Sequence, residues 1–240
     1  MPSFNQLPAG SHTGAVLIIP ALDEEAVIGA TLASIPSGLF ESVIVADNGS
    51  TDSTARIASA HGATVVRETE RGYGAACLRA LQSVPSSCSI VVFMQADSSE
   101  DPAEAAALLA PILDGRADFV LGSRVLGQAD AGAILPHQAF GNWLATALIR
   151  LLWHHTYTDL GPFRAIRLDL LRQLDMRDRN FGWTIEMQIK ALRHRLRILE
   201  IPVRYKVRAA GENKVSGNLA ASVRAAIKIF AVIGRLYLRP

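Results

Sequence analysis

Residues 42–52 read SVIVADNGSTD, a short run of β-branched apolar residues that ends in a polar, turn-forming segment. The apolar part, Ser42–Ala46, has the composition of a buried strand, and the Asp, Asn and Gly after it are typical of a sharp turn. Ala15–Pro20 (AVLIIP) has the same character and is stopped by a proline. These two stretches predict strands at the centre of a sheet.

Helical and strand-like segments alternate along the rest of the chain. The pattern predicts strands at Ala15–Pro20, Ser42–Ala46, Ala63–Val66, Ile90–Met94, Phe119–Gly122 and Arg197–Tyr205. Helical spacing covers Glu24–Ser34, Ser53–Ala60, Ala75–Val84, Pro102–Leu113, Phe140–Trp153, about Trp183–His194 and a final segment near the C-terminus. This alternation predicts an α/β fold with a mainly parallel central sheet flanked by helices. A length of 240 residues suits a single domain.

The net charge of +2 conceals an asymmetry. Residues 1–142 contain 6 Lys and Arg against 15 Asp and Glu, whereas residues 143–240 contain 18 against 7. A basic half indicates an anionic partner. The basic residues are not interleaved with stacking aromatics, which argues against nucleic acid and favours phosphate groups or an acidic membrane surface.

The sequence carries no sign of export. Two cysteines are too few for a disulfide framework, and residues 1–14 lack the basic and apolar regions of a targeting signal. No run of 18 uncharged apolar residues is present, so we expect no transmembrane helix. These features predict a cytoplasmic protein.

Three acidic, turn-forming segments each follow a predicted strand: PALDEE at 20–25, DNGSTD at 47–52 and QADSS at 95–99. Ligands of open α/β sheets bind beyond the carboxyl ends of the strands. One such turn alone is typical of solvated surface. Three such turns, each directly after a predicted strand, predict a common site.

With RGYGAA at 71–76, these segments resemble the successive signatures of family-2 glycosyltransferases, most closely the branch with dolichyl-phosphate mannose and glucose synthases. The likeness covers roughly residues 15–235. It implies a single domain of the GT-A type at 15–218, with a nucleotide-binding half (15–122) and an acceptor-binding half (123–218). A flexible tail (1–14) precedes the domain, and an amphipathic helix (219–240) follows it.

The implied activity is inverting transfer of a hexose from a UDP- or GDP-sugar to a polyprenyl phosphate, a lipid or a small hydroxyl acceptor. The implied donor-binding residues are Pro20, Ala21, Leu22, Glu24, Asp47, Gly49, Arg71, Gln95, Ala96 and Asp97. Asp47 would contact the base and Glu24 the ribose, since carboxylates accept hydrogen bonds from ring N–H and hydroxyl groups. Gly49 and Gly72 permit tight turns. Arg71 faces either the diphosphate or solvent.

The family holds a divalent cation with a D-x-D motif, which here reads Gln95-Ala96-Asp97. The resemblance makes Asp97 the metal residue, for Mg²⁺ or Mn²⁺, with weaker binding because one carboxylate is missing. This departure keeps a second hypothesis open, a non-catalytic protein that binds a nucleotide-sugar. A sugar-phosphate nucleotidyltransferase is less favoured, because no Gly-rich basic loop follows the first strand.

DLGPFR at 159–164, FGWTIEMQ at 181–188 and GENKVSG at 211–217 resemble acceptor-side elements of the same family. Asp159 is the implied general base with Glu186 behind it, although a phosphate acceptor requires no strong base. Arg164, Trp183 and Lys214 are the implied acceptor or phosphate contacts. Core packing is the alternative for Trp183. We expect His154 and His155 to be loop residues.

Arg224, Lys228, Arg235 and Arg239 fall within about 60° of one another on the final helix. This basic stripe predicts either peripheral contact with an anionic membrane, at the inner face of the cell membrane, or a core-packed helix with snorkelling basic residues.

Overall fold

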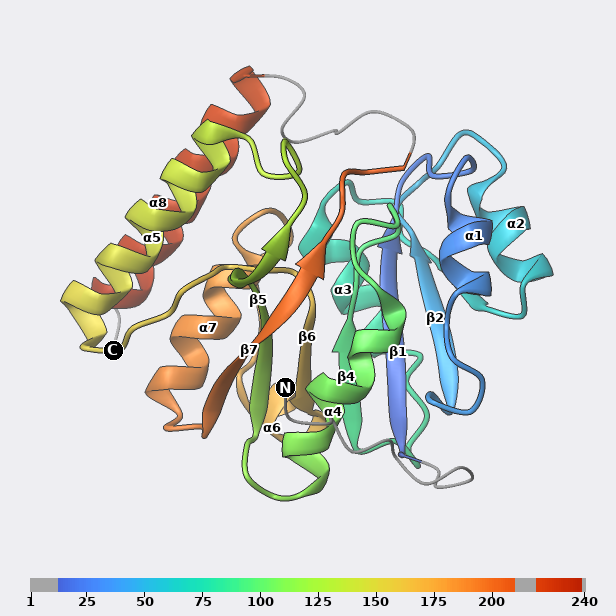
Figure 1. Cartoon of the computed structure of the whole chain (residues 1–240), viewed down its shortest axis with the longest axis horizontal. Helices are drawn as coiled ribbons and strands as arrows, with labels where there is room; N and C mark the ends of the chain where they lie inside the picture. Colours follow the sequence, from blue (N-terminus) through green and yellow to red (C-terminus); the bar gives the residue numbers. More distant parts are fainter. Residues whose placement is uncertain (1–12, 210–218, 239–240) are drawn as a thin grey trace.

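The computed structural model describes residues 13–209 and 219–238, with side chains from residue 227 onward in the last helix (Figure 1). Lys214 and most of the expected N-terminal tail therefore lie outside the described residues. The strands are β1 (Ala15–Ala21), β2 (Ser42–Asp47), β3 (Thr64–Arg67), β4 (Ile90–Phe93), β5 (Phe119–Ala129), β6 (Arg164–Arg167) and β7 (Ile198–Tyr205).

Apart from α6, which was not expected, the helices begin and end within a few residues of the expected positions. They are α1 (Ile28–Ala33), α2 (Thr54–Ala60), α3 (Tyr73–Leu81), α4 (Ala105–Leu113), α5 (Pro136–Trp153), α6 (Leu168–Gln173), α7 (Trp183–Arg193) and α8 (Leu219–Leu238), with a 3₁₀ turn at Pro102–Glu104 before α4. α1 is shorter than expected, because residues 24–27 form a turn that carries the acidic segment.

The seven strands form one sheet in the order β3-β2-β1-β4-β6-β5-β7. β1 pairs in parallel with both β2 and β4, and β5 pairs in parallel with β7. β6 runs antiparallel between β4 and β5. The predicted α/β fold with a mainly parallel sheet is confirmed, but β6 and α6 were not predicted, since RAIR gives no clear periodic signal.

The central strands are buried on both faces, which explains their continuous apolar runs. Val16 and Ile18 of β1 pack with α3, α5, α7 and α8, whereas Leu17 and Ile19 pack with α1, α2 and α4 on the opposite face. The helices thus form two layers around the sheet (Figure 1). Because β1, β2 and β4 run parallel, their carboxyl ends lie at one edge of the sheet.

α5 and α8 lie side by side at one side of the molecule (Figure 1), and α8 also contacts α7. Val232, Ile233 and Leu236 bury one side of α8 in the core. Two residues of the expected basic stripe point toward the α7 region: Lys228 Nζ lies 3.2 Å from Asp178 Oδ2, and Arg235 Nη2 lies 3.8 Å from Glu186 Oε1. The described part of this stripe therefore serves the packing of α8.

None of the helices in the described part of the chain has the combined length and apolar character needed to cross a bilayer.

Candidate functional site

A cavity of about 550 Å³ lies at the carboxyl ends of the parallel strands. Its volume is within the range typical of small-molecule sites. The lining residues come from both halves of the chain: Pro20, Ala21, Leu22, Glu24, Asn48, Arg71, Gly72, Tyr73, Ala76, Gln95, Ala96, Asp97, Arg124, Gln138, Leu160, Pro162, Asn180, Phe181, Thr184, Tyr205, Arg208 and Ile229.

The first two acidic turns hold each other through reciprocal hydrogen bonds. The backbone N–H of Asp23 donates to Ser50 Oγ at 2.9 Å, and that of Thr51 donates to Asp23 Oδ1 at 2.7 Å. The Glu24 N–H donates to Thr54 Oγ1 at 2.7 Å. These bonds fix the backbone of Glu24, so that its side chain lies at the cavity.

Asn48 ties the second turn to the segment before α3. Its amide donates to the Glu70 carbonyl at 2.7 Å, and its Oδ1 accepts from the Gly72 N–H at 2.7 Å. Gly72 and Gly74 then pass so close to another loop that a Cβ on Gly74 would lie 2.0 Å from the Asp178 carbonyl oxygen. The residue type at position 74 is therefore set by tertiary packing.

Gln95 and Asp97 face the cavity from the end of β4. Asp97 Oδ1 accepts from the Ser99 N–H at 3.0 Å and from Ser99 Oγ at 2.5 Å. Gln95 Oε1 accepts from Tyr205 Oη at 3.3 Å. Arg208 donates to Glu24 and has its Nη1 3.4 Å from Asp97 Oδ2. Carboxylates from the first and third acidic segments thus share one guanidinium.

Glu100 lies beneath this group and is 3% exposed. Its Oε2 accepts from the Gln95 N–H at 2.8 Å, whereas Oε1 has no hydrogen-bond partner among the described residues. The pKa of Glu100 is raised to about 8, mainly by burial and also by the nearby charge of Asp97, against the lowering effect of the Gln95 N–H. The site therefore rests on a carboxyl group that is largely protonated near neutral pH.

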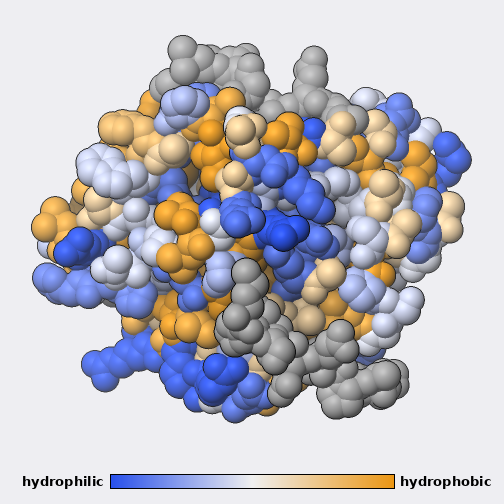
Figure 2. Space-filling model, in the orientation of Figure 1, coloured by the Kyte–Doolittle hydropathy of each residue, from blue (hydrophilic) through white to orange (hydrophobic). Residues whose placement is uncertain are grey.

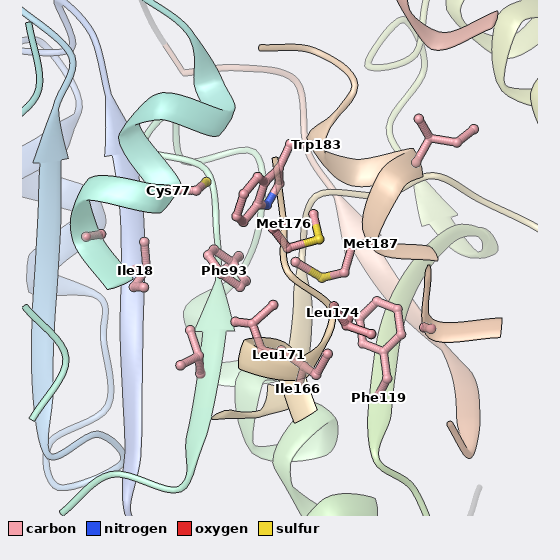
Figure 3. Close-up of a cluster of buried hydrophobic side chains, with 14 of the residues drawn as sticks. Ile18, Cys77, Phe93, Phe119, Ile166, Leu171, Leu174, Met176, Trp183 and Met187 are labelled. Atoms are coloured by element: carbon pink, nitrogen blue, oxygen red, sulfur yellow. The ribbon is translucent and has the colours of Figure 1, made fainter. Parts of the chain in front are cut away.

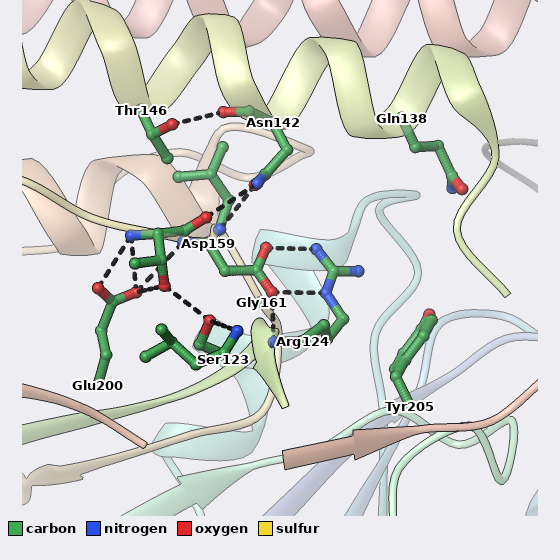
Figure 4. Close-up of polar contacts among 12 residues, drawn as sticks. Ser123, Arg124, Gln138, Asn142, Thr146, Asp159, Gly161, Glu200 and Tyr205 are labelled. Atoms are coloured by element: carbon green, nitrogen blue, oxygen red, sulfur yellow. Dashed lines mark hydrogen bonds and ion pairs between the residues drawn. The ribbon is translucent and has the colours of Figure 1, made fainter. Parts of the chain in front are cut away.

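Arg124 forms a two-pronged ion pair with Asp159 (Figure 4). Its Nε and Nη2 lie 2.8 and 2.7 Å from the two carboxylate oxygens, and its backbone N–H also donates to Oδ2 at 2.9 Å. The guanidinium carbon lies 5.0 Å from the centre of the Tyr205 ring. Asp159 is 1% exposed and lies outside the cavity lining, whereas Arg124 is part of that lining. Asp159 therefore orients Arg124 from behind.

The structure brings most of the expected donor-binding residues to the cavity, namely Pro20, Ala21, Leu22, Glu24, Arg71, Gln95, Ala96 and Asp97. Asp47 and Gly49 are not in its lining. The Asp47 carboxylate is buried and accepts from the Ser50 N–H at 3.0 Å, which leaves its neighbour Asn48 at the cavity wall. Gly49 has a positive φ of 79° beside Arg71, as its expected role in a tight turn requires.

Besides Asp159, three expected acceptor-side residues lie away from the cavity lining. Trp183 is fully buried, with its ring centre 6.1 Å from that of Phe93, so the core alternative describes its position (Figure 3). Arg164 is also buried and donates to the carbonyls of Leu160, Gly161 and Thr184.

Glu186 is the third of these residues. Its Oε2 accepts from the backbone N–H groups of Arg177 and Asp178 at 3.1 and 2.6 Å, and Lys190 Nζ lies 2.9 Å from Oε1. The carboxylate therefore supports residues 177–182, which include the cavity residues Asn180 and Phe181.

The sequence analysis did not single out Asn48, Arg124, Tyr205 or Arg208, although all four line the cavity. Arg124 and Arg208 each follow a stretch expected to be a strand, as do the acidic turns. A cation shortly after an expected strand is thus the sequence signal that both arginines share.

Comparisons with known proteins place the chain in a family. Residues 16–175 match the family model described as glycosyl transferase family 2. An uncharacterized glycosyltransferase of Mycobacterium tuberculosis is 35% identical over 218 residues, which cover 90% of this chain and 96% of that protein. Undecaprenyl-phosphate mannosyltransferase of Micrococcus luteus is 28% identical, over 84% of this chain and 87% of that protein.

Among solved structures, glucosyl-3-phosphoglycerate synthase from Mycobacterium tuberculosis, in complex with Mn²⁺ and uridine-diphosphate-glucose, superposes with a TM-score of 0.72. The sequence identity is 26%, and the superposition covers 94% of this chain and 79% of the synthase chain.

Proposed function

The chain belongs to glycosyltransferase family 2, and from this premise we propose that it transfers a hexose from a UDP- or GDP-sugar to a polyprenyl phosphate. One observation carries the proposal: a single cavity holds Glu24 and Asp97 from strand ends together with Arg71, Arg124 and Arg208. Carboxylates suit the ribose and a cation, whereas arginines suit phosphate groups. The similarity to a mannosyltransferase of undecaprenyl phosphate supports this acceptor class.

For the donor, we assign Glu24 to the ribose hydroxyls, and Pro20, Ala21 and Leu22 to the wall beside the base. Asp47 acts indirectly, because its buried carboxylate holds the turn that places Asn48. Arg71 faces the cavity and is assigned to the diphosphate.

A divalent cation fits the cavity chemistry. Asp97 and Gln95 offer a carboxylate and an amide oxygen, the hard ligands that Mg²⁺ and Mn²⁺ prefer. Within residues 13–209 and 219–238, no group of three or more His, Cys, Asp or Glu side chains is placed to hold a metal ion by itself. When bound, the cation neutralises charge on the diphosphate leaving group. Asp97 would hold it, and Arg71 and Arg208 would add positive charge.

The positions of the carboxylates favour a phosphate acceptor. An alcohol must lose its proton during transfer, which requires a positioned base. Asp159 is held by Arg124 and Glu186 by Lys190, and both lie outside the cavity lining. A phosphate oxygen is already anionic, and Arg124 at the cavity provides a bidentate partner for it. Direct attack of that oxygen on the anomeric carbon displaces the nucleoside diphosphate and inverts the centre.

A polyprenyl phosphate resides in a membrane. We therefore propose that the protein works in peripheral contact with an anionic membrane, at the inner face of the cell membrane.

The test measures sugar transfer in detergent to a polyprenyl phosphate and, separately, to the corresponding polyprenol. UDP- and GDP-sugars are the donors, and Mn²⁺ is present. We expect transfer to the phosphate and none to the alcohol. Asp97→Asn should lower the rate on the order of 100-fold, since it removes the charged metal ligand, whereas Gln95→Asp should lower the Mn²⁺ concentration required. Transfer to the alcohol alone contradicts the acceptor assignment. Donor binding without transfer to any acceptor supports the non-catalytic alternative.

A further inference from the structure

The outward faces of α5 and α8 form an apolar surface that the cavity does not use. On α5, Phe140 and Trp143 are each 61% exposed and Leu151 is 69% exposed. At 100° per residue these three and the exposed Ala147 fall within about 80° of one another. The Phe140 and Trp143 ring centres lie 5.8 Å apart.

The described half of α8 continues this surface. Ile227 is 62% exposed and Leu238 78% exposed, and the exposed Ala231 lies on the same side of the helix. α5 and α8 pack side by side (Figure 1), and each exposed stripe lies on the side of its helix opposite the buried residues, so the two stripes together are here termed the α5–α8 face. On the side of the molecule seen in Figure 2, apolar residues gather over the upper left, where Figure 1 places these helices.

The charge on these helices has one sign. Neither Pro136–Trp153 nor Leu219–Leu238 contains an Asp or a Glu. Arg150 is exposed beside the apolar stripe of α5. Apolar and aromatic side chains on helices whose charged residues are all cations match the interface of a bilayer with anionic headgroups. A second copy of the chain would instead bring like charges together across a two-fold contact.

The cavity lies on the inner side of the same two helices. Gln138 of α5 and Ile229 of α8 contribute to the cavity lining, and each lies two residues, about 200° around its helix, from exposed Phe140 or Ile227. The two helices therefore separate the α5–α8 face from the cavity.

We propose that the α5–α8 face docks on an anionic lipid bilayer, with the two helices between the headgroups and the cavity. Docking uses the apolar stripes of both helices, with Trp143 and Phe140 at its centre, and the basic stripe expected from the sequence is not its main contact. Lys228 and Arg235 are paired with Asp178 and Glu186, so they anchor α8 to the protein. The inference rests on the proposed function only for its purpose, delivery of a lipid-linked acceptor.

The test is co-sedimentation of the full chain with vesicles of phosphatidylcholine containing phosphatidylglycerol, and with vesicles of phosphatidylcholine alone. We expect binding to the mixed vesicles, weakened by salt, and a blue shift of tryptophan emission as Trp143 leaves water. Trp143→Ser combined with Leu151→Glu should reduce binding roughly tenfold or more, since affinity scales with the apolar area buried. The matched control is Leu113→Glu, because Leu113 is 41% exposed on α4 at the opposite face of the sheet.

Circular dichroism confirms that each variant is folded, and donor binding without vesicles shows that its cavity is intact. Equal vesicle binding by the double variant and the wild type overturns the proposal, as does absence of binding by the wild type. A concentration-dependent dimer that the double variant loses, without vesicle binding, also overturns it in favour of a second copy. Sugar transfer in detergent is measured separately, so its failure with vesicle binding intact contradicts the proposed function alone.

Discussion

Arg208 and Asp97 approach across 111 residues of sequence, with Arg208 Nη1 3.4 Å from Asp97 Oδ2 while the same guanidinium also donates to Glu24. The Arg208 side chain is 17% exposed. In this arrangement a fixed cation lies between the two carboxylates assigned to the ribose and to the metal. Entry of a donor with its own cation must therefore rearrange this contact.

Arg208→Gln removes that internal cation. We expect Mn²⁺ to bind more tightly in the absence of nucleotide, by several-fold, because Asp97 no longer interacts with a guanidinium. We expect sugar transfer to become slower, since the variant also lacks a positive charge near the diphosphate. Calorimetric titration with Mn²⁺ checks the first outcome. The control is Arg204→Gln, an exposed residue of β7; equal Mn²⁺ affinity in both variants contradicts competition at Asp97.

Arg124→Gln leaves the Asp159 carboxylate buried without its partner. Breaking a buried pair of this kind costs about 3–5 kcal/mol, and the melting temperature should fall on the order of 10 °C. Asp159→Asn in the same chain should recover part of that loss, because it removes the unmatched charge. A double-mutant cycle by urea unfolding measures the coupling. Additive effects of the two substitutions would show that the pair contributes no coupling energy.

Substitution of Gly74 and of Gly141 by alanine should change the free energy of unfolding in opposite directions. A Cβ at Gly74 would lie 2.0 Å from the Asp178 carbonyl oxygen, whereas one at Gly141 in α5 meets nothing within 4 Å. Gly74→Ala should lower the free energy of unfolding by about 2 kcal/mol or more. Gly141→Ala should raise it by about 0.5–1 kcal/mol, because alanine favours the helix. Chemical denaturation measures both, and a neutral Gly74→Ala contradicts the packing described here.

Glu100 makes stability depend on pH. Burial raises its pKa from 4.5 to about 8, so the folded state holds a proton that the unfolded state releases. The contribution of Glu100 is therefore present in full below about pH 4.5 and is lost as pH rises through about 8. Glu100→Gln stays neutral, and its free energy of unfolding should decline less than that of the wild type over this window. Urea unfolding at several pH values measures this free energy. Equal declines for Glu100→Gln and the wild type would rule out the contribution of Glu100.

The donor side of the site was predictable because its signals are local. Each acidic turn follows a short apolar strand directly, and the carboxyl ends of neighbouring parallel strands meet at one edge. Glu24, Gln95 and Asp97 therefore lie together as expected. The acceptor side gave weaker signals. β6 has four residues without clear alternation, and no pattern shows that Arg164 points into the protein.

The sequence by itself determined the alternating elements, the mainly parallel sheet and the edge at which its polar turns meet, since hydrophobic periodicity and turn chemistry act over a few residues. Only the tertiary structure decided which side chains reach the cavity. Arg124 is tied to Asp159 across 35 residues, and Trp183 is buried against Phe93. Such contacts depend on the directions of side chains from elements far apart in the chain, and neither spacing nor propensity encodes those directions locally.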